Sequence, residues 1–389
     1  MLSFQVTEDQ QRLKARARAF ARDVVAPHVT EMDRTNNYPW PVVRAMADEG
    51  FMGLTIPKKY GGGGRPLIDA ILVVEELAKV CGTVARVCVD ANTAVQKAIV
   101  EYGTEEQRAY FLPGIVKGDK PAIAITEPEV GSAATSLTTT AVKDADCYVL
   151  NGEKRWITGA SVCNLYLVFA RFDGRAGAEG IGGVLVEATA PGLSVPNIRV
   201  MMGVRGMPEG DVVFRNCRVP ATNLLAKPGD GFKRLMSAYN LQRLGAAAVA
   251  LGIAQGAYEL AAGYAVRREQ FGRPIGDFQG VQWMLADMHI QLECSRLLIY
   301  RAAANAGHGF PDKVEAAAAK IHSAEMAIAV TNTALQIHGA AGYSCDLPIE
   351  RMVRDARMFS IGGGTAQMQR NLIGRDILQH ARTQIRDVA

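Results

Sequence analysis

Apolar residues recur at helical spacing through the first third of the chain. Thr7 and Gln10 form a pattern typical of a helix-capping box, and they precede apolar residues on one helical face at 13, 17, 20, 24 and 25. A first helix is therefore predicted to begin near residue 8. The same spacing, interrupted by the glycine run 61–64, predicts further helices over 40–49, 68–80 and 86–102. Residues 1–120 are expected to form an N-terminal helical domain.

From residue 121 the pattern changes to short runs rich in β-branched and aromatic residues. These runs predict strands at 148–150, 165–169, 183–186 and 212–214, with Asn151 and Gly152 as a hairpin turn. Long Ala- and Leu-rich helical segments resume after Gly231, over 246–268, 281–306, 314–336 and 367–381. The expected fold class is α+β and mostly α, with a middle β domain at 121–230 and a C-terminal helical bundle at 231–389.

Composition narrows the class of partner. The 389 residues are 49% hydrophobic and 21% charged, with a formal net charge of +4, so no strong field favours nucleic acid. The first twenty residues lack the apolar core of a signal peptide, and no run of eighteen apolar residues occurs, so we expect a cytoplasmic protein without a membrane span. The seven cysteines form no Cys-x-x-Cys pair and the six histidines stand apart, so neither disulfides nor a metal site are expected.

Three segments carry polar groups suited to a cofactor. The segment 124–132, AITEPEVGS, offers the hydroxyls of Thr126 and Ser132 beside loop N–H groups, although it also reads as an ordinary turn. The run RWITG places Trp156 two residues before Thr158, where the indole could equally be core. The run RREQFGRP at 267–274 closes a long helix with two guanidiniums. They could bind phosphate, or they could be the solvated end of the helix.

Taken together, in this order and spacing, the segments resemble the acyl-CoA dehydrogenase family over about residues 6–380. The resemblance implies a helical domain, a β domain and a four-helix bundle, with FAD between the last two and an acyl-CoA substrate. It also implies a homo-oligomer, usually a tetramer, with flavin sites shared between subunits. By this resemblance the flavin ring is expected to contact Ile123, Ile125, Thr126, Trp156 and Thr158, with Ser132 near the flavin and the pantetheine arm.

The same resemblance assigns further cofactor contacts to the C-terminal third. Thr365 and Gln367 are expected to contact the dinucleotide at the start of the last helix, where a helix N-terminus favours phosphate. Six residues are expected to reach the FAD of a neighbouring subunit, namely Arg268, Phe271, Gln279, Gln336, Gly339 and Ala340.

The catalytic carboxylate of the family is missing from this chain. Typical members have Tyr-Glu-Gly-Thr before the last helix, and this chain has Gly362-Gly363-Gly364-Thr365. Glycine keeps a backbone N–H for the thioester carbonyl but supplies no general base. A minority of the family carries the base next to the position of Arg243, and that residue is Gln242 here, a neutral amide. Ala133 also replaces an aspartate that most members have.

These departures resemble a branch of the family that removes sulfite from a sulfinate-bearing short acyl-CoA. That resemblance implies that Arg86 binds the sulfinate and that Gln242 stands in for the helix-borne glutamate. A guanidinium can hold a compact two-oxygen anion through two charge-assisted hydrogen bonds, although Arg86 could also be a surface helix arginine. The predicted catalytic residues are Arg86, Gln242 and Gly363. The predicted substrate contacts are Arg86, Ser132, Gln242, Arg243 and Gly363.

Two other functions remain open from the sequence. A dehydrogenase of a short or dicarboxylic acyl-CoA could use an unusual base such as Glu127 or Asp90, and it would need an electron-transferring flavoprotein. A non-catalytic homologue would bind FAD and acyl-CoA without turnover. Bleaching of the flavin by substrate distinguishes a dehydrogenase from a desulfinase.

Overall fold

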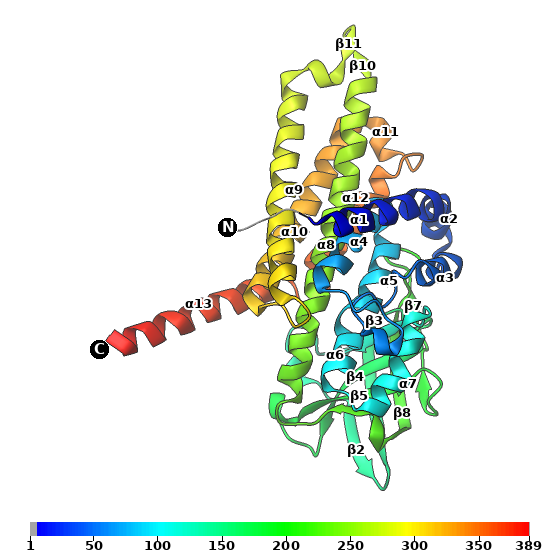
Figure 1. The fold of residues 1–389 in the computed structure, drawn as a ribbon, viewed down its shortest axis with the longest axis vertical. Helices are drawn as coiled ribbons and strands as arrows, with labels where there is room; N and C mark the ends of the chain where they lie inside the picture. The colour runs from blue at the N-terminus through cyan, green and yellow to red at the C-terminus, as the bar shows by residue number, and fades with distance from the viewer. Residues whose placement is uncertain (1–5, 389) are drawn as a thin grey trace.

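The computed structural model describes residues 6–388, with side chains through residue 385. Residues 1–5, which open the segment expected to be a mature N-terminus, and Ala389 lie outside the described part. Helices come first, a β-rich segment follows, and long helices return, so the predicted class, α+β and mostly α, is confirmed (Figure 1). The boundaries after residues 120 and 230 remain predictions.

Short helices build the N-terminal part. The predicted capping box is confirmed, because Thr7 Oγ1 accepts from the Gln10 N–H at 3.3 Å and the Gln10 side chain accepts from the Thr7 N–H at 3.0 Å. A π-helical turn at Ala21–Val25 joins the first two helices. The helices are α1 Glu8–Phe20, α2 Ala26–Thr35, α3 Trp40–Asp48, α4 Leu67–Ala78, α5 Gly82–Asn92, α6 Ala94–Tyr102 and α7 Glu105–Val116.

The single helix predicted over 86–102 is wrong, because the chain breaks at Thr93. Its backbone, at φ −124° and ψ −121°, separates α5 from α6. The Asn92 side-chain amide donates to the Cys88 carbonyl at 2.8 Å, and the Thr93 hydroxyl lies 2.7 Å from the Val89 carbonyl. Thr331 makes the same side-chain contact inside the unbroken helix α10, Lys313–His338, so it is the non-helical backbone at Thr93 that marks the end of α5.

A nine-stranded sheet forms the middle of the chain, in the order β6-β8-β3-β2-β4-β5-β9, with β1 beside β4 and β7 beside β8. Its register brings the end of β3 next to the start of β8, with Thr158 opposite Glu209. The strands are β1 Pro121–Ala124, β2 Thr140–Asp144, β3 Cys147–Thr158, β4 Leu165–Phe172, β5 Ile181–Glu187, β6 Leu193–Ser194, β7 Ile198–Arg199, β8 Glu209–Pro220 and β9 Leu224–Ala226.

The hairpin turn predicted at Asn151-Gly152 is also wrong, because these residues lie inside β3. The chain turns earlier, where Asp144 pairs with Cys147 and Ala145 has φ 51°. At Gly152 the β3–β8 register shifts, and a Cβ on this residue would lie 2.4 Å from Thr139 Oγ1. Gly152 therefore permits a close chain approach inside the strand, which a pattern of local turn residues does not distinguish from a hairpin.

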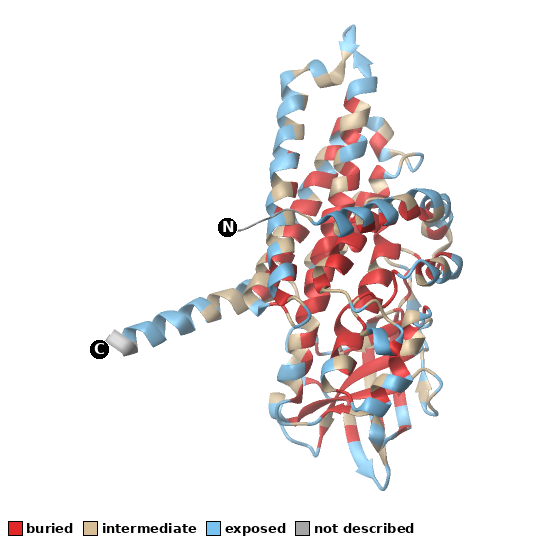
Figure 2. Cartoon of the chain, viewed as in Figure 1, coloured by how far each residue is buried: buried red, intermediate tan, exposed pale blue. Residues whose placement is uncertain are grey.

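Long helices make the C-terminal part. The central helix α8, Gly231–Arg267, packs against α9 Gln279–Ala306 and α10 Lys313–His338, and a short β10–β11 hairpin at 269–274 joins α8 to α9. The short helices α11 Ala340–Tyr343 and α12 Ile349–Arg357 follow, and α13, Ala366–Val388, projects away from the body (Figure 1). Buried residues gather around α8, whereas α13 is largely exposed (Figure 2).

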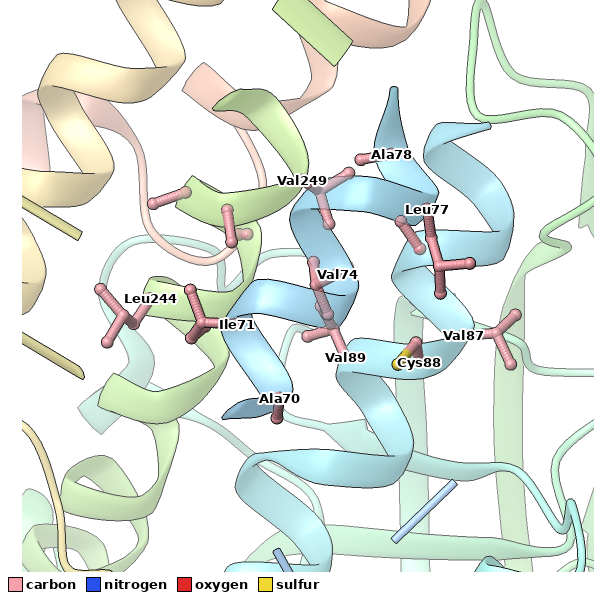
Figure 3. Packing of buried hydrophobic residues seen from close by; sticks show 14 of the residues in the cluster. Ala70, Ile71, Val74, Leu77, Ala78, Val87, Cys88, Val89, Leu244 and Val249 are labelled. Carbon is pink, nitrogen blue, oxygen red and sulfur yellow. The ribbon is translucent and has the colours of Figure 1, made fainter. Parts of the chain in front are cut away.

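Helix α8 joins the N-terminal helices to the bundle through one hydrophobic core. Figure 3 shows Ile71 and Val74 of α4, Val89 of α5, and Leu244 and Val249 of α8 packed together. By length and mean hydropathy, 1.3 over eighteen residues, α8 alone among helices of the described part could cross a membrane. Because 78% of that window is buried inside the protein, α8 fits the role of a core helix.

Glycine at position 252 allows α4 and α8 to approach closely. A Cβ there would lie 2.4 Å from Ala78 Cβ and 2.5 Å from the Glu75 carbonyl oxygen. We expect Gly252→Ala to lower the free energy of unfolding by about 1–3 kcal/mol, because overpacking outweighs the helix propensity of alanine. Thermal unfolding measures the change. The matched control is Gly263→Ala in the same helix, where a Cβ meets only the mobile Arg267 guanidinium and stability should not fall.

Candidate active site

A buried carboxylate, Asp90 on α5, gathers polar side chains from three parts of the chain. Its Oδ1 accepts from Gln242 Nε2 of α8 at 2.7 Å, and its Oδ2 accepts from Lys120 Nζ, just before β1, at 2.8 Å. Arg86 Nε lies 3.4 Å from Oδ1, one helical turn away. We call Arg86, Asp90, Lys120 and Gln242 the Asp90 cluster. It brings together the predicted residues Arg86 and Gln242, 156 positions apart in the sequence.

Arg86 is not a surface arginine. Its side chain is 12% exposed, and its guanidinium also lies against the sulfur of Met358, at 3.9 Å. Burial alone would lower the pKa of Arg86, but the charges of Asp90 and Glu209 outweigh burial and raise it. The guanidinium therefore stays charged inside the protein, as an anion-binding group must.

Gln242 is buried and held at both ends of its amide. Its nitrogen donates to Asp90, and its Oε1 lies 2.6 Å from the Thr93 hydroxyl. The break between α5 and α6 thus places a hydroxyl on the amide oxygen. These two contacts fix the orientation of the amide, with its nitrogen toward Asp90. Because the side chain is an amide, this position supplies no carboxylate.

The glycine run lies against two cations of the helical bundle. Arg243 Nε donates to the Gly363 carbonyl at 3.2 Å, and Lys320 Nζ of α10 donates to the Gly364 carbonyl. Gly363 has φ +75°, and a Cβ built on it would meet only Lys320 Cε, at 4.0 Å. Within residues 6–388 its N–H makes no backbone hydrogen bond. Gly363 therefore offers open space and a backbone donor, whereas a Cβ on Gly364 would lie 2.5 Å from Gln369 Nε2.

Positive charge dominates around these glycines. Burial, together with the charges of Arg243 and Arg86, lowers the pKa of Lys320 to about 8. Burial also lowers the pKa of Arg243, whose Nη1 donates to Asn240 Oδ1 at 2.7 Å. The burial of both cations and the repulsion that acts on Lys320 favour binding of an anionic group beside them.

The residues expected at the flavin ring line the adjoining end of the β domain. Ile123 lies on β1, with Ile125 and Thr126 directly after it, and all three are half-buried. Trp156, at φ 59°, is 51% exposed rather than core. Lys120 Nζ also donates to the Thr158 carbonyl at 3.3 Å, which connects this surface to the Asp90 cluster.

These residues fit a flat aromatic cofactor. The Arg199 guanidinium lies over the Trp156 ring, 4.5 Å from its centroid, and the part of the indole that stays exposed, with the aliphatic side chains of Ile123 and Ile125, offers apolar surface. Thr126 and Thr158 supply hydroxyls. Ser132 is exposed in the loop that follows the tight turn at Glu127–Val130.

Residues expected to reach a neighbouring subunit lie far from this surface. Arg268, Phe271 and Gln279 surround the β10–β11 hairpin, at the opposite end of the molecule from the sheet (Figure 1). Phe271 is 93% exposed, and Gln336, Gly339 and Ala340 are exposed where α10 ends. One chain does not bring these six residues to its own flavin surface.

The start of α13 has the geometry expected for Thr365 and Gln367. Thr365 lies just before Ala366, the first residue of α13, and its hydroxyl accepts from the Met368 N–H at 3.2 Å. Gln367 is exposed in the first turn. Free N–H groups at a helix start favour phosphate.

The structure adds one residue that the sequence did not single out, Glu209 at the start of β8. Its Oε1 accepts from the Thr158 hydroxyl at 2.8 Å. Burial raises the pKa of Glu209 to about 7, although Arg86 opposes the shift. No local motif marks this residue, because its neighbours come from strands and helices distant in sequence.

The two carboxylates considered as unusual bases are poorly suited to that role. Glu127 accepts from Lys154 Nζ at 2.8 Å and from the N–H groups of Thr138 and Thr139 at 2.6 and 2.9 Å. Burial would raise the pKa of Glu127, but Lys154 outweighs burial and lowers it to about 2. Burial opposes ionisation of Asp90 too, and there Lys120 and Arg86 prevail and lower the pKa. Strongly stabilised carboxylates are weak bases.

A cavity of about 1090 Å³ lies elsewhere, between α1–α2 and the chain around α12. Its lining includes Arg18, Asp33 and Arg354. None of the predicted catalytic residues lines this cavity, so the cavity and the predicted catalytic residues lie in different parts of the protein. We place the candidate site at the Asp90 cluster and the glycine run, because groups with shifted pKa values gather there.

Comparison with known proteins identifies the family. Models of the N-terminal, middle and C-terminal domains of acyl-CoA dehydrogenase match residues 7–119, 122–217 and 229–378. The chain belongs to the acyl-CoA dehydrogenase family, whose cofactor is FAD. The butyryl-CoA dehydrogenase structure of Megasphaera elsdenii is 36% identical, with TM-score 0.94, over 97% of this chain and 100% of that one.

Several similar relatives share one particular name. A protein of Paraburkholderia xenovorans called 3-sulfinopropanoyl-CoA desulfinase is 49% identical over 96% of this chain and 97% of its own. A protein of Cupriavidus necator with the same name is 50% identical, covering 96% of each. A short-chain acyl-CoA dehydrogenase of Clostridium acetobutylicum is 38% identical over 97% of this chain and 100% of its own.

Glu127 should matter for stability rather than for catalysis. Since its folded pKa, about 2, is below the ordinary value of 4.5, its contribution is present above pH 4.5 and is lost as pH falls toward 2. We expect Glu127→Gln to lower the free energy of unfolding by about 3 kcal/mol at pH 7, because Lys154 loses its buried partner. The acid loss of stability between pH 4.5 and 2 should also become shallower, as thermal unfolding at stepped pH would show.

The control for Glu127→Gln is Glu153→Gln, whose side chain is 39% exposed beside Arg155. An exposed ion pair contributes less than about 1 kcal/mol. Unchanged stability in Glu127→Gln, combined with complete loss of turnover, would instead make Glu127 a base.

Proposed function

We propose that this chain is an FAD-containing desulfinase that converts 3-sulfinopropanoyl-CoA to propionyl-CoA and sulfite. The observation that carries the proposal is Arg86, a largely buried and charged guanidinium beside a site where both usual positions of the family's base lack a carboxylate. The relatives called 3-sulfinopropanoyl-CoA desulfinase support the choice of substrate.

Arg86 is the proposed anchor for the sulfinate. Its Nε lies near Asp90, and its remaining N–H groups can form two charge-assisted hydrogen bonds to the two sulfinate oxygens. Asp90 keeps the guanidinium charged and oriented, while Lys120 shares the carboxylate. Gln242, held between Thr93 and Asp90, is proposed to orient the sulfinate or a water molecule beside it.

The thioester end is proposed to bind at the glycine run. The Gly363 N–H can donate to the thioester oxygen, and Arg243 and Lys320 fix the run through its carbonyls. Absence of a side chain at Gly362 and Gly363 leaves space there. It also removes a negative charge that would repel an anionic substrate.

Desulfination does not require the glutamate base that the family normally uses. The β-carbon keeps the electron pair of the C–S bond and takes a proton, while sulfur leaves and gains the oxygen of water. The net reaction is a hydrolysis without an electron acceptor, so no base has to attack the α-carbon. A glutamate at position 363 would be unnecessary.

The residues proposed to hold FAD are those that line the β-domain surface. Ile123, Ile125 and Trp156 would pack on the ring system, and Thr126, Thr158 and Ser132 would supply hydroxyl contacts. Thr365 and Gln367 would bind the dinucleotide at the start of α13. When bound, FAD supplies a flat wall beside the acyl group, and it is the redox group of the family.

A second function is supported by one observation, the raised pKa of Glu209. A carboxyl with pKa about 7 beside Thr158 could serve as the base of a short-chain or dicarboxylic acyl-CoA dehydrogenase. Such an enzyme would require an electron-transferring flavoprotein as partner. The buried cations and the relatives' name favour desulfination over this alternative and over a non-catalytic FAD-binding homologue.

We also propose a homotetramer with shared flavin sites, in the cytoplasm. Trp283, Ile290 and Leu297 repeat every seven residues on one face of α9 and are 62, 59 and 48% exposed. Ile377 and Ile385 on the projecting α13 are similarly exposed. Exposed apolar faces of this kind fit subunit contacts. The remote Arg268 and Phe271 would then reach the flavin of a neighbour.

Ile290 should be needed for assembly. We expect Ile290→Asp to convert tetramers to smaller species, because a charge would be buried in the contact, and to lower the FAD content per chain. Sedimentation velocity and the 450 nm absorbance report the two effects. Val142→Asp is the control, since Val142 is 58% exposed on β2, outside the proposed contact. A tetramer with full FAD in Ile290→Asp would contradict this interface.

Sulfite release tests the function directly. The purified protein, loaded with FAD, is mixed with 3-sulfinopropanoyl-CoA under anaerobic conditions without an electron acceptor. We expect sulfite and propionyl-CoA in equal amounts, because the reaction needs only water. Absence of sulfite, together with bleaching of the flavin by butyryl-CoA or succinyl-CoA, would assign the chain to the dehydrogenases.

Arg86 variants identify the anchor in the same assay. We expect Arg86→Met to lower kcat/KM at least about 100-fold, since loss of a buried charged partner costs about 3–5 kcal/mol. Arg86→Lys should recover part of that loss by restoring the charge without the two-pronged geometry. Arg12→Met, a 69% exposed arginine on α1, should leave the rate unchanged. Unchanged kcat/KM in Arg86→Met would remove Arg86 from the site.

A further inference from the structure

We propose that Glu209 is the proton donor that delivers a proton to the β-carbon as the C–S bond breaks. This inference rests on the proposed desulfination, in which the β-carbon gains a proton that no residue discussed so far supplies. Asp90 and Glu127 are held ionised by lysines at 2.8 Å, and Gln242 is an amide. Glu209 is the carboxyl left in the site without a lysine within ion-pair distance among residues 6–388.

Backbone register fixes the position of Glu209. It opens β8 and pairs with Thr158 at the end of β3, and the Thr158 hydroxyl donates to its Oε1 at 2.8 Å. Just before it, the Arg205 carbonyl accepts from the Thr83 hydroxyl of α5 at 2.8 Å. The strand start is therefore tied both to the proposed flavin surface and to the helix that carries Arg86.

Charged and titratable groups face Glu209 from three directions. Arg86 and Asp90 come from α5, Lys120 precedes β1, and Tyr239 comes from α8. Arg86 and Lys120 favour the carboxylate, whereas Asp90 disfavours it. Burial exceeds the effect of the cations, so the pKa of Glu209 rises to about 7 and a large fraction carries a proton at neutral pH.

The anchor of the sulfinate places the β-carbon near this carboxyl. The sulfur is bonded to the β-carbon, so a sulfinate held by Arg86 puts that carbon one bond beyond the anion. Thr158 links Glu209 to the Asp90 cluster, because its hydroxyl donates to Glu209 at 2.8 Å and its carbonyl accepts at 3.3 Å from Lys120, the lysine paired with Asp90 beside Arg86. The Thr158 hydroxyl donates to Oε1 of Glu209, so the other carboxyl oxygen can carry the proton.

The step balances without any oxidant or reductant. The electron pair of the C–S bond stays on carbon and takes the proton of Glu209, which yields the methyl group of propionyl-CoA and sulfur dioxide. Sulfur dioxide then combines with water to give bisulfite and a proton, and that proton restores the acid form of Glu209. Carbon is reduced, sulfur is oxidised, and the net consumption is one water molecule.

The pH dependence of single-turnover sulfite formation tests this role. In the unaltered enzyme the rate should fall as pH rises above about 7, because the carboxyl loses the proton that it must donate. Glu209→Gln should lower the rate about 100-fold or more, with little change in KM, and should abolish that fall. A fall that persists in Glu209→Gln would overturn the proposal and point to another group, such as Lys320.

Two further variants complete the test. Glu209→Asp keeps a carboxyl one methylene short, so it should retain the fall with pH at a lower rate. If Glu209→Gln does not bind FAD, Glu209→Asp decides, because a rate equal to that of the unaltered enzyme would overturn the proposal. Glu187→Gln, a half-buried glutamate on β5 that contacts Tyr110, should change neither rate nor pH profile.

Failure of this inference is distinguishable from failure of the proposed function. If the unaltered enzyme releases no sulfite, the desulfinase proposal itself is wrong. If it releases sulfite and Glu209→Gln releases it equally fast with the same pH profile, desulfination stands and Glu209 is not the proton donor.

Discussion

The Asp90 carboxylate is the contact on which the arrangement of the candidate site depends. It receives Lys120 from the start of the β domain, Gln242 from the central helix of the bundle, and Arg86 from its own helix. Three segments of the chain thus meet on two oxygen atoms. Because removing one partner of a buried ion pair leaves an uncompensated charge, each partner constrains the positions of the others.

The carboxyl groups of the site differ in whether a lysine lies close to them. Asp90 and Glu127 each have a lysine at 2.8 Å and stay ionised, whereas Glu209, among the residues that the structure describes, has only the Thr158 hydroxyl as a close partner. Burial therefore acts against the charge of Glu209 with less compensation, and its pKa rises to about 7. Neighbouring carboxyl groups held at different pKa values are a common basis for acid and base chemistry in one site.

The cations around the glycine run complete the electrostatic picture. In the family, a glutamate occupies the position of Gly363, and here Arg243 and Lys320 lie against the glycine run without that counter-charge. Burial lowers the pKa of Arg243, and burial together with the charges of Arg243 and Arg86 lowers the pKa of Lys320. An anionic acyl group, as proposed for the substrate, would supply the missing negative charge and would link the loss of the base to a change of substrate.

The sequence alone determined the order of helical and β segments, the capping box at Thr7, and the replacement of the usual base by Gly363 and Gln242. These features depend on residue identity and on periodicity within a few turns of chain. The predictions that were wrong also came from local patterns in the sequence. The Asn151-Gly152 pair indicated a hairpin, but the neighbouring Thr139 made it a close approach inside β3. The break at Thr93 lies within a stretch of continuous helical spacing, so the spacing did not reveal it.

Only the tertiary structure decided that Arg86 is buried, that Glu209 belongs to the site, and that Arg268 and Phe271 lie too far away to serve their own chain's flavin surface. Burial and pKa are sums over groups that are distant in sequence, because electrostatic interactions and desolvation depend on distance in space. Glu209 follows Arg86 by 123 residues, so no sequence window contains both. The identity of the residues limits the chemistry, and the fold determines which of them meet.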